Sequence, residues 1–366
     1  MTIQRRRNIL RLGFISAVMT ACAMGAARAE TAPQHGEAVN EYLASTAPDA
    51  RLAMLAREAA REGRVVLYAA IGIDRAKIFL DMFNAKYPNV KVDFVRLTVN
   101  ELAQRVMAES RTGRVGSDVI MTTPDWFGVI GPAIGSYRPT TWSSYDPRFL
   151  YQGQSPKWAA LDYEILPEAI AWRTDRVKSA EAPKTLDDLA DPKWSGRLGT
   201  VTNLERVVDA FTGIYGEKEA IAKIEALAKN KNRLYPTIGG LSSALASGEV
   251  DVAWGVGAYR AAALKASGAP VDYVIPSPTL AISIAMGVTR NAPHPYAAAL
   301  MTEFLSDATT LEKSDAAESG RTFGNLKGKY QAPVTGFHNL VMIKAIAPDK
   351  LRDYNRMVER LFIRAQ

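Results

Sequence analysis

The residue types that catalyse reactions or bind metals are few in this sequence, and they lie far apart. The 366 residues include three histidines, His35, His294 and His338, and a single cysteine, Cys22. The histidines have neither of the zinc-binding spacings H-x-x-E-H and H-E-x-x-H. The chain also lacks a G-x-S-x-G elbow, a G-x-x-x-x-G-K phosphate loop and a C-x-x-C pair. We therefore expect no catalytic residue, no metal site and no cofactor.

A strand-to-helix junction near the start of the chain offers binding groups instead. The segment 63–83, GRVVLYAAIGIDRAKIFLDMF, has the pattern of a strand that enters a helix through a short turn. The turn at 69–72 holds Ala, Ala, Ile and Gly, so it carries no reactive side chain. A helix N-terminus presents unpaired N–H groups and a positive dipole end, and small residues let a ligand approach them. We interpret the junction as one that holds a ligand without transforming it.

Hydrophobic periodicity predicts alternating strands and helices. A helix that Asp49 caps is expected to end near Gly63, with Leu52, Leu55 and Ala59 on its inner face. The expected strands are Val65–Ala69, Val90–Val95, Asp118–Met121, Glu168–Arg173, Arg197–Val201, Val250–Trp254, Val271–Ile275 and Ile282–Thr289. The expected helices are Lys77–Lys86, Asn100–Gly113, Pro183–Leu189, Leu204–Tyr215, Lys218–Asn230, Gly240–Ala246, Ala258–Ala266, Pro295–Ser306 and Pro348–Arg364. This order predicts an α/β fold with a mostly parallel sheet, followed by a second α/β unit.

Three stretches lack such a pattern. Residues 30–48 are mixed in composition, and we expect a mobile start there. Residues 136–156 are rich in Tyr, Trp, Pro and Ser, which favours a long surface excursion. Gly255–Gly257 is expected to form a turn; it lacks the third glycine of a dinucleotide-binding loop.

The basic excess of the sequence belongs to its first 29 residues. The formal charge is +7, but residues 1–29 hold five arginines and no acid, so the remainder carries +2. A basic stretch, the apolar run Leu12–Ala27 and the small-x-small sequence at 27–29 predict a signal peptide cleaved before Glu30. Arg6–Arg11 resembles the twin-arginine export motif, with ordinary secretion as the alternative. Lipidation at Cys22 is a further alternative. We expect a periplasmic protein that binds no nucleic acid.

Several motifs resemble those of bacterial extracellular solute-binding proteins of ABC importers. The segments RVVLY at 64–68 and FNAKYPNVKV at 83–92 are similar to the opening of these proteins. Further matches follow in the family's order within 108–119, 183–198, 246–251 and 291–295, and DPKWSG at 191–196 is among the most distinctive. The resemblance covers residues 64–325 and is strongest to the branch that binds ferric iron, thiamine, polyamines and phosphonates.

This resemblance implies a type 2 periplasmic binding protein fold, in which two α/β lobes joined by a hinge enclose an interlobe ligand cleft. The expected first lobe combines residues 64–165 with 280–366, and the expected second lobe is 166–279. Residues 30–63 would form an N-terminal extension and leader helix behind the signal peptide.

Carried over position by position, the resemblance also implies ligand-binding residues at strand ends. They are Tyr68, Ala70, Ile71, Thr122, Thr123, Trp126, Arg173, Thr200, Thr202, Asn203, Thr237, Gly239, Gly240, Trp254 and Tyr259. The segment 237–240 precedes a helix and would suit an anion. Each position has a structural alternative: the aromatic residues as core, the threonines as helix caps and the glycines as turn residues.

The resemblance leaves the ligand open. Ferric-binding members present a His, a Glu and a Tyr pair at places that here hold Gly72, Thr123 and Ala258-Tyr259. Bare Fe³⁺ is disfavoured, since it prefers several anionic oxygens, whereas an iron chelate stays open. Glu205 facing the cleft would favour a cationic amine; in the first turn of its helix it would instead complement the dipole. Arg173 would pair with an acidic solute.

We therefore expect a monomeric, non-enzymatic protein that captures a small polar solute and delivers it to the permease subunits of an ABC importer. The alternatives are ferric iron delivery through Tyr259 and cleft carboxylates, a ligand-presenting subunit for a membrane sensor, and a periplasmic hydrolase.

Overall fold

The computed structural model describes residues 33, 36–317, 339–343, 346 and 348–364. The predicted signal peptide with Cys22, as well as His35 and His338, lie outside the described residues. By their contacts, residues from Pro33 onward form one unit. In the described part of the chain, no helix combines the length and apolar character that a membrane span requires.

A parallel three-stranded sheet begins the fold, as the pattern of residues 64–121 predicts. β1 (Arg64–Ala69) pairs with β2 (Lys91–Arg96) on one side and β3 (Val119–Thr122) on the other. α3 (Ile73–Lys86) and α4 (Val99–Thr112) connect the three strands. β3 is buried throughout and β1 from its second residue onward, as expected for apolar strands covered on both faces.

A second sheet forms from the middle of the chain. Its parallel strands are β6 (Leu198–Val201), β7 (Arg233–Tyr235) and β8 (Val252–Gly257), and β9 (Val271–Val274) joins through an antiparallel neighbour. The helices of this part are α6 (Glu205–Tyr215), α7 (Glu217–Ala228), α8 (Ile238–Ser247) and α9 (Ala258–Ala266). The second α/β unit that the sequence predicts is therefore present.

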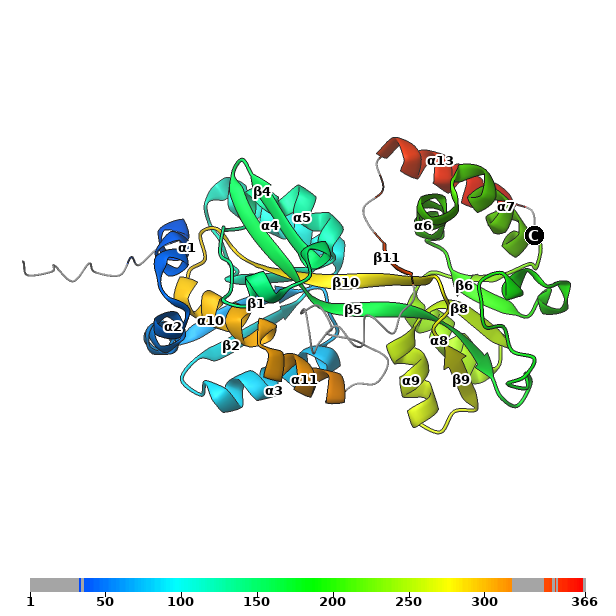
Figure 1. The fold of residues 1–366 in the computed structure, drawn as a ribbon, viewed down its shortest axis with the longest axis horizontal. Helices are drawn as coiled ribbons and strands as arrows, with labels where there is room; N and C mark the ends of the chain where they lie inside the picture. The colour runs from blue at the N-terminus through cyan, green and yellow to red at the C-terminus, as the bar shows by residue number, and fades with distance from the viewer. Residues whose placement is uncertain (1–32, 34–35, 318–338, 344–345, 347, 365–366) are drawn as a thin grey trace, which may run out of the picture. The chain divides into compact units, whose positions relative to one another are not determined.

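Two long antiparallel strands connect the sheets, and they run side by side in Figure 1. β5 (Lys157–Arg173) pairs with β4 (Leu150–Gln154) and β10 (Thr279–Val288) in its first part, and with β8 and β9 from Glu168 onward. β10 extends from β5 to β3, and β11 (Leu340–Met342) pairs with its start. The two α/β parts are thus joined through shared strands.

The sequence predicts only the second part of β5, from Glu168. Residues 157–167 contain Asp162 and Glu164, which normally indicate exposure, yet the strand is buried from Ala159 onward. Both acids have partners inside the protein: Asp162 accepts hydrogen bonds from hydroxyl groups of β4 and β10, and Glu164 pairs with an arginine of α3. A buried, paired acid has the same appearance in a sequence as an exposed one, so the pattern failed there.

The region 36–45 is helical, so the expectation of a mobile start over 30–48 is wrong for that part. α1 (Gly36–Ser45) buries Val39 and Leu43 completely. Its Glu37 carboxylate accepts a hydrogen bond from the backbone N–H of Ser136 at 2.9 Å. Two apolar residues one turn apart gave too weak a helical pattern to detect.

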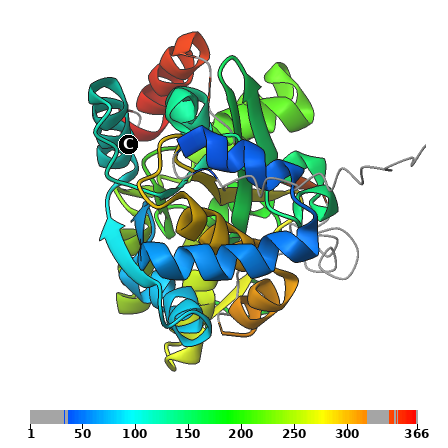
Figure 2. The same cartoon turned by 90° about the vertical axis from the view of Figure 1, so that its left-hand side faces the viewer.

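The predicted leader helix is present as α2 (Pro48–Glu62), and it packs along α10 (Pro295–Ser306) (Figure 2). It ends at Gly63, whose φ of +72° favours glycine. The N-cap is Ala47 rather than Asp49, which lies in the first turn. Leu52 is 43% exposed instead of facing inward.

Residues 136–156 lie partly at the surface, as predicted, but several of their aromatic side chains pack inside the protein. Tyr137, Tyr145 and Phe149 are buried, and the segment ends in β4. The Tyr137 hydroxyl donates a hydrogen bond to Glu303 of α10 at 2.5 Å. Aromatic side chains bury a large apolar area, which outweighs the polar composition around them.

Three further predictions differ from the structure. Residues 183–189 form turns that lead into a short 3₁₀ segment, Asp188–Ala190, rather than a helix. Gly255–Gly257 lies within β8, where Gly255 has a φ of +69°, rather than in a turn. The pattern indicated neither β7 nor β11, nor α11 (Ala308–Ala317). By contrast, α9 and α10 have the predicted bounds.

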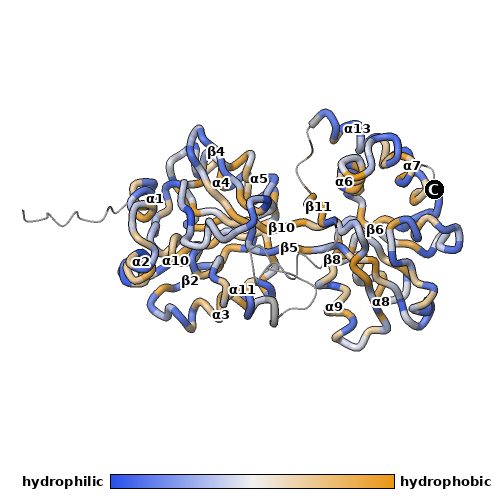
Figure 3. Tube along the Cα trace, viewed as in Figure 1, coloured by the Kyte–Doolittle hydropathy of each residue, from blue (hydrophilic) through white to orange (hydrophobic). Residues whose placement is uncertain are grey.

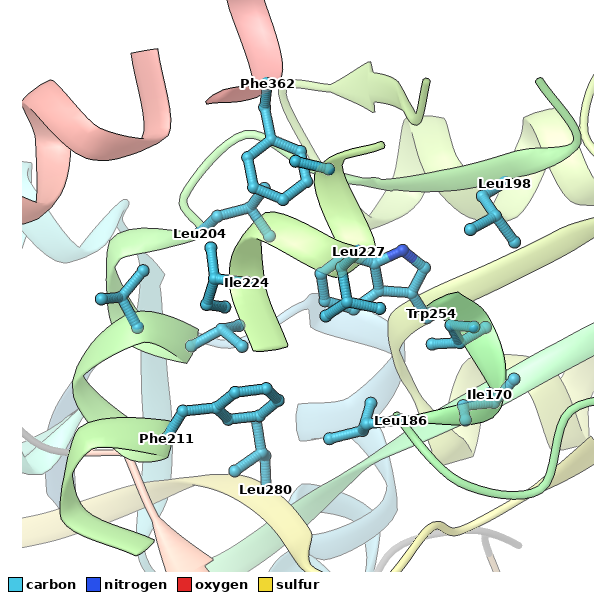
Figure 4. Close-up of a cluster of buried hydrophobic side chains, with 14 of the residues drawn as sticks. Ile170, Leu186, Leu198, Leu204, Phe211, Ile224, Leu227, Trp254, Leu280 and Phe362 are labelled. Atoms are coloured by element: carbon cyan, nitrogen blue, oxygen red, sulfur yellow. The ribbon is translucent and has the colours of Figure 1, made fainter. Parts of the chain in front are cut away.

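The C-terminal helix packs on the helices of the second sheet. α13 (Pro348–Val358) continues into a π-helical segment (Glu359–Ile363). Together the two segments occupy most of the helix that the sequence predicts at Pro348–Arg364. Tyr354, Val358 and Phe362 join a buried cluster with side chains of α6, α7 and β8. Figure 4 shows Phe362 pointing into this cluster, and Figure 3 shows apolar residues along the connecting strands.

We expect Phe362→Ala to lower the free energy of unfolding by about 3 kcal/mol, because it empties a buried aromatic site. Phe362 is 1% exposed, whereas its neighbour Ile363 is 58% exposed. The matched control Ile363→Ala should therefore change stability by only about 0.5 kcal/mol. Urea unfolding of both variants measures the difference. Equal effects would contradict the packing of this segment on the second sheet.

Candidate ligand-binding site

Two adjoining cavities lie where segments of both sheets meet. The α6 cavity, of about 390 Å³, is lined by the start of α5 (Pro124–Ile130), the start of α6, β10 and the segment after β11. The β4 cavity, of about 590 Å³, is lined by α5, the residues around β4, the start of β5 and β10. The two share the residues Pro124, Asp125, Ser283 and Ile343. Volumes in this range suit small-molecule ligands.

Strand ends place the polar residues of the α6 cavity. Thr123 follows β3 and occupies the N-cap position of α5, although its side chain makes no capping bond. Asn203 follows β6, before α6 begins. Ser283 lies within β10, one of the two strands that connect the sheets. A site at the carboxyl ends of strands is the usual one in open α/β sheets.

Among the described residues, the charged groups of the α6 cavity leave an excess of negative charge. Asp125 is exposed and Glu205 is half-buried, and neither forms a hydrogen bond or ion pair with any residue that the structure describes. Arg206 is buried and already neutralised, because its guanidinium pairs with the buried carboxylate of Glu168. Its Nε also donates to the backbone carbonyl of Asn203 at 3.1 Å.

A fully buried carboxyl group, Asp162, lies behind the wall of the β4 cavity. The Ser283 hydroxyl donates to Asp162 Oδ1 at 2.9 Å, and the Tyr151 hydroxyl donates to Oδ2 at 3.0 Å. Burial raises the pKa of Asp162 to about 8, although these two hydrogen bonds act in the opposite direction. Both hydroxyl groups belong to cavity-lining residues, so the cavity and the buried acid are directly connected.

Arginines surround Tyr259, the tyrosine that the sequence singled out. The guanidinium of Arg75, on α3, lies 5.3 Å from the centre of the Tyr259 ring and pairs with Glu164 of β5. Arg260 Nε donates to the Tyr259 hydroxyl at 3.1 Å. Tyr259 therefore contacts two cations and lines neither cavity.

The structure brings a minority of the predicted site residues to the cavities. Thr123 and Asn203 line the α6 cavity, and so does Glu205, which is also in the first turn of α6. Glu205 therefore faces the cavity and also lies in the first turn, where its charge complements the dipole of α6. Thr237 caps α8, with its hydroxyl accepting from the N–H of Gly240 at 3.0 Å. Its neighbour Ile238 lines the cavity.

Other predicted residues have side chains inside the protein. The Trp254 indole is buried in the core and donates to Asn232 at 2.8 Å. Thr200 is buried and donates to the Trp254 carbonyl at 3.0 Å. The Tyr68 hydroxyl donates to Glu109, and burial with this contact raises the pKa of Tyr68 to about 12. For these residues the structure shows the packing role that we considered as the alternative.

The remaining predicted residues lie outside both cavities. Arg173 pairs with Asp175 and donates to the carbonyls of Leu245 and Ala246. The others are Ala70, Ile71, Thr122, Trp126, Thr202, Gly239 and Gly240, of which Ile71 and Thr122 are buried. A ligand contact by any of them stays a prediction.

Sequence reasoning missed several cavity residues. Asp125 comes two residues after Thr123, so the strand-end rule that identified Thr123 would also have found it. Ser283 and Tyr151 lie within strands, where nothing in the sequence separates them from ordinary strand residues. Ile343 follows β11, which the pattern did not predict.

Comparison with known proteins identifies the family. The family model described as bacterial extracellular solute-binding protein matches residues 79–321. The chain belongs to this family. Iron-bound HitA from Pseudomonas aeruginosa superposes with a TM-score of 0.63 at 19% identity, covering 81% of this chain and 99% of HitA. The substrate-binding protein of an ABC transporter from Agrobacterium tumefaciens gives 0.67 at 15% identity, covering 81% and 94%. The fold is that of a two-lobed type 2 periplasmic binding protein.

A curated relative is similar over a shorter stretch. The Fe(3+)-binding periplasmic protein of Serratia marcescens is 24% identical over 185 residues, which are 49% of this chain. The match spans 53% of that relative, about half its length. In the described part of this chain, no three His, Cys, Asp or Glu side chains are grouped so as to hold a metal ion.

Proposed function

We propose that this protein is the periplasmic solute-binding component of an ABC importer. It holds a small polar solute in the α6 and β4 cavities and delivers it to the permease. The observation that carries this proposal is the convergence of α5, α6 and β10 on one site, because residues from both sheets line the α6 cavity. A ligand that contacts both parts stabilises the arrangement in which they are close together.

We also propose lobe boundaries. The first lobe would contain residues 64–165 and the chain from 280 to α11, and the second lobe would contain residues 166–279. The packing of α13 on α6 supports placing residues 348–364 with the second lobe, which differs from the boundary expected from the sequence. β5 and β10 would be the hinge, because they are the long strands shared by the two sheets.

Export and partners complete the proposal. Residues 1–29 would direct the chain to the periplasm, with the twin-arginine route supported by Arg6 and Arg7. The mature protein would act as a monomer, and its partners would be the solute and the permease subunits. A ligand-presenting role for a membrane sensor stays an alternative prediction. A permease gene next to the gene of this protein would argue against it.

The test is recovery of a solute with the protein. Protein purified from its own periplasm is analysed by native mass spectrometry, and the recovered solute is added back to protein freed of it. At 100 times Kd the solute should raise the free energy of unfolding by about 2.7 kcal/mol. Reconstituted permease should then transport that solute only when this protein is present. Turnover of the solute by the protein alone would contradict a binding function.

Ferric iron is the second candidate, and the Serratia marcescens relative favours it. We expect ferric citrate to produce no visible charge-transfer band and no thermal stabilisation, because Tyr259 contacts the cations Arg75 and Arg260 and the described residues contain no cluster of His, Cys, Asp or Glu side chains that could hold a metal ion. Absorbance spectra with ferric citrate, and with citrate alone as control, test this. A band that disappears in Tyr259→Phe would establish iron binding instead.

A further inference from the structure

We propose that the solute is an organic cation with N–H donors, such as an ammonium or guanidinium compound, held between Asp125 and Glu205. This inference rests on the proposed function and concerns the chemistry of the same two cavities. It combines the charge of the lining, the direction of its hydrogen bonds and its aromatic surface.

The charge of the lining favours a cation. Among the residues that the structure describes, four charged ones line the two cavities: Asp125, Glu205, Arg206 and Arg148. Both arginines have carboxylates of their own, since Arg206 pairs with Glu168 and Arg148 pairs with the neighbouring Asp146 at 2.8 Å. Asp125 and Glu205 have no such partner among the residues that the structure describes. An anionic solute would approach arginines that already have carboxylate partners, whereas a cation would neutralise two carboxylates that have none among the described residues.

The hydroxyl groups of the wall also require a donor. Once a bound cation has favoured the ionised form of Asp162, this carboxylate can only accept hydrogen bonds, so the hydroxyl hydrogens of Ser283 and Tyr151 point toward it. The lone pairs of those two oxygens are then left for the cavity. A solute that contacts Ser283 or Tyr151 must supply the hydrogen, which an ammonium does and a carboxylate or phosphate does not.

Hydroxyl groups face Asp162 from neighbouring segments. Ser283 faces it from β10, Tyr151 from β4 and the buried Tyr145 from the segment before β4, and the carboxylate of Asp125 lines the same cavity as Ser283 and Tyr151. Burial keeps the pKa of Asp162 near 8, so it is largely protonated at pH 7. A cation bound beside Ser283 would favour the ionised form, and binding would release the proton.

Aromatic side chains complete the site. Tyr151 and Trp158 line the β4 cavity, and Trp158 is held in place by Phe127, with ring centres 6.3 Å apart. The faces of such rings attract ammonium and guanidinium groups, especially where water is excluded. The two cavities together thus offer carboxylates and π surface, which match a cation with an organic body.

Calorimetric titration of the exported form of the protein tests the proposal with four probes: spermidine, choline, glucose and citrate. Spermidine carries charge and N–H donors, choline carries charge alone, and the other two are neutral and anionic. We expect binding of spermidine, at least tenfold weaker binding of choline, and no binding of glucose or citrate. Asp125→Asn and Glu205→Gln should each weaken spermidine binding at least tenfold. The control is Asp74→Asn, which removes an exposed carboxylate in the first turn of α3 and should leave the affinity unchanged.

A second measurement, the number of protons released on binding, tests the role of Asp162. Titrations at pH 7 in buffers of different ionisation enthalpy should show release of close to one proton on spermidine binding, and Asp162→Asn should abolish it. Binding of citrate or glucose in preference to both cations, or an affinity unaffected by Asp125→Asn and Glu205→Gln, would overturn the cation inference and leave the solute-binding function intact. Failure of every probe, together with no solute recovered from the periplasm, would overturn the proposed function and this inference with it.

Discussion

Replacing Arg206 by methionine will lower the free energy of unfolding by about 3–5 kcal/mol, because it leaves the Glu168 carboxylate buried without a counter-charge. Both members of this pair are buried, with Arg206 on α6 and Glu168 on β5. The loss measures the desolvation of the remaining charge rather than the strength of the pair. Urea unfolding at pH 7 gives the value directly.

The effect should depend on the second member of the pair. Adding Glu168→Gln to Arg206→Met should restore part of the loss, because it removes the buried charge that has lost its partner. Arg64→Met is the control, since Arg64 pairs with Asp93 at a half-exposed position and should cost about 1 kcal/mol or less. A cost for Arg206→Met no larger than for Arg64→Met would contradict the buried pair.

Replacing Asp162 by asparagine will remove a large pH dependence of stability. The pKa of Asp162 is raised to about 8 by burial, whereas an aspartate in the unfolded chain titrates near 3.9. The folded state therefore holds a proton that the unfolded state loses. Its contribution to stability is fully present below about pH 4 and is lost progressively as the pH rises to about 8. One pKa unit corresponds to about 1.4 kcal/mol, so the wild type should lose roughly 5 kcal/mol relative to Asp162→Asn across this range.

Chemical denaturation of both proteins at several pH values between 4 and 8 measures this difference. Asp74→Asn, at an exposed position, should follow the wild-type curve throughout. Parallel curves for wild type and Asp162→Asn would show that Asp162 titrates like an exposed acid, and would remove the proton release expected on binding of a cation.

The alternation of strands and helices was predictable because most elements have one dominant environment. β1, β3, β6 and β8 are short apolar runs that are buried on both faces, and α9 and α10 are bounded by clear turn residues. β5 was only half predictable. Its first part holds Asp162 and Glu164, whose burial depends on partners from β4, β10 and α3 that are distant in sequence.

The site was less predictable than the fold for the same reason. Thr123, Asn203 and Glu205 were found because they follow strand ends, a local feature that the sequence displays. Ser283 and Tyr151 act through a hydrogen-bond network that spans three strands, which no local pattern indicates. Trp254 and Tyr68 had the right place in the chain, but their side chains turn into the protein, and sequence position does not determine that direction.

A crystal structure of the protein with the solute recovered from its own periplasm is the most direct test of the central claim. We predict that the solute lies in the adjoining α6 and β4 cavities, in contact with Asp125 of the first lobe and Glu205 of the second. A solute bound elsewhere, or held by one lobe alone with both cavities empty, would contradict the account.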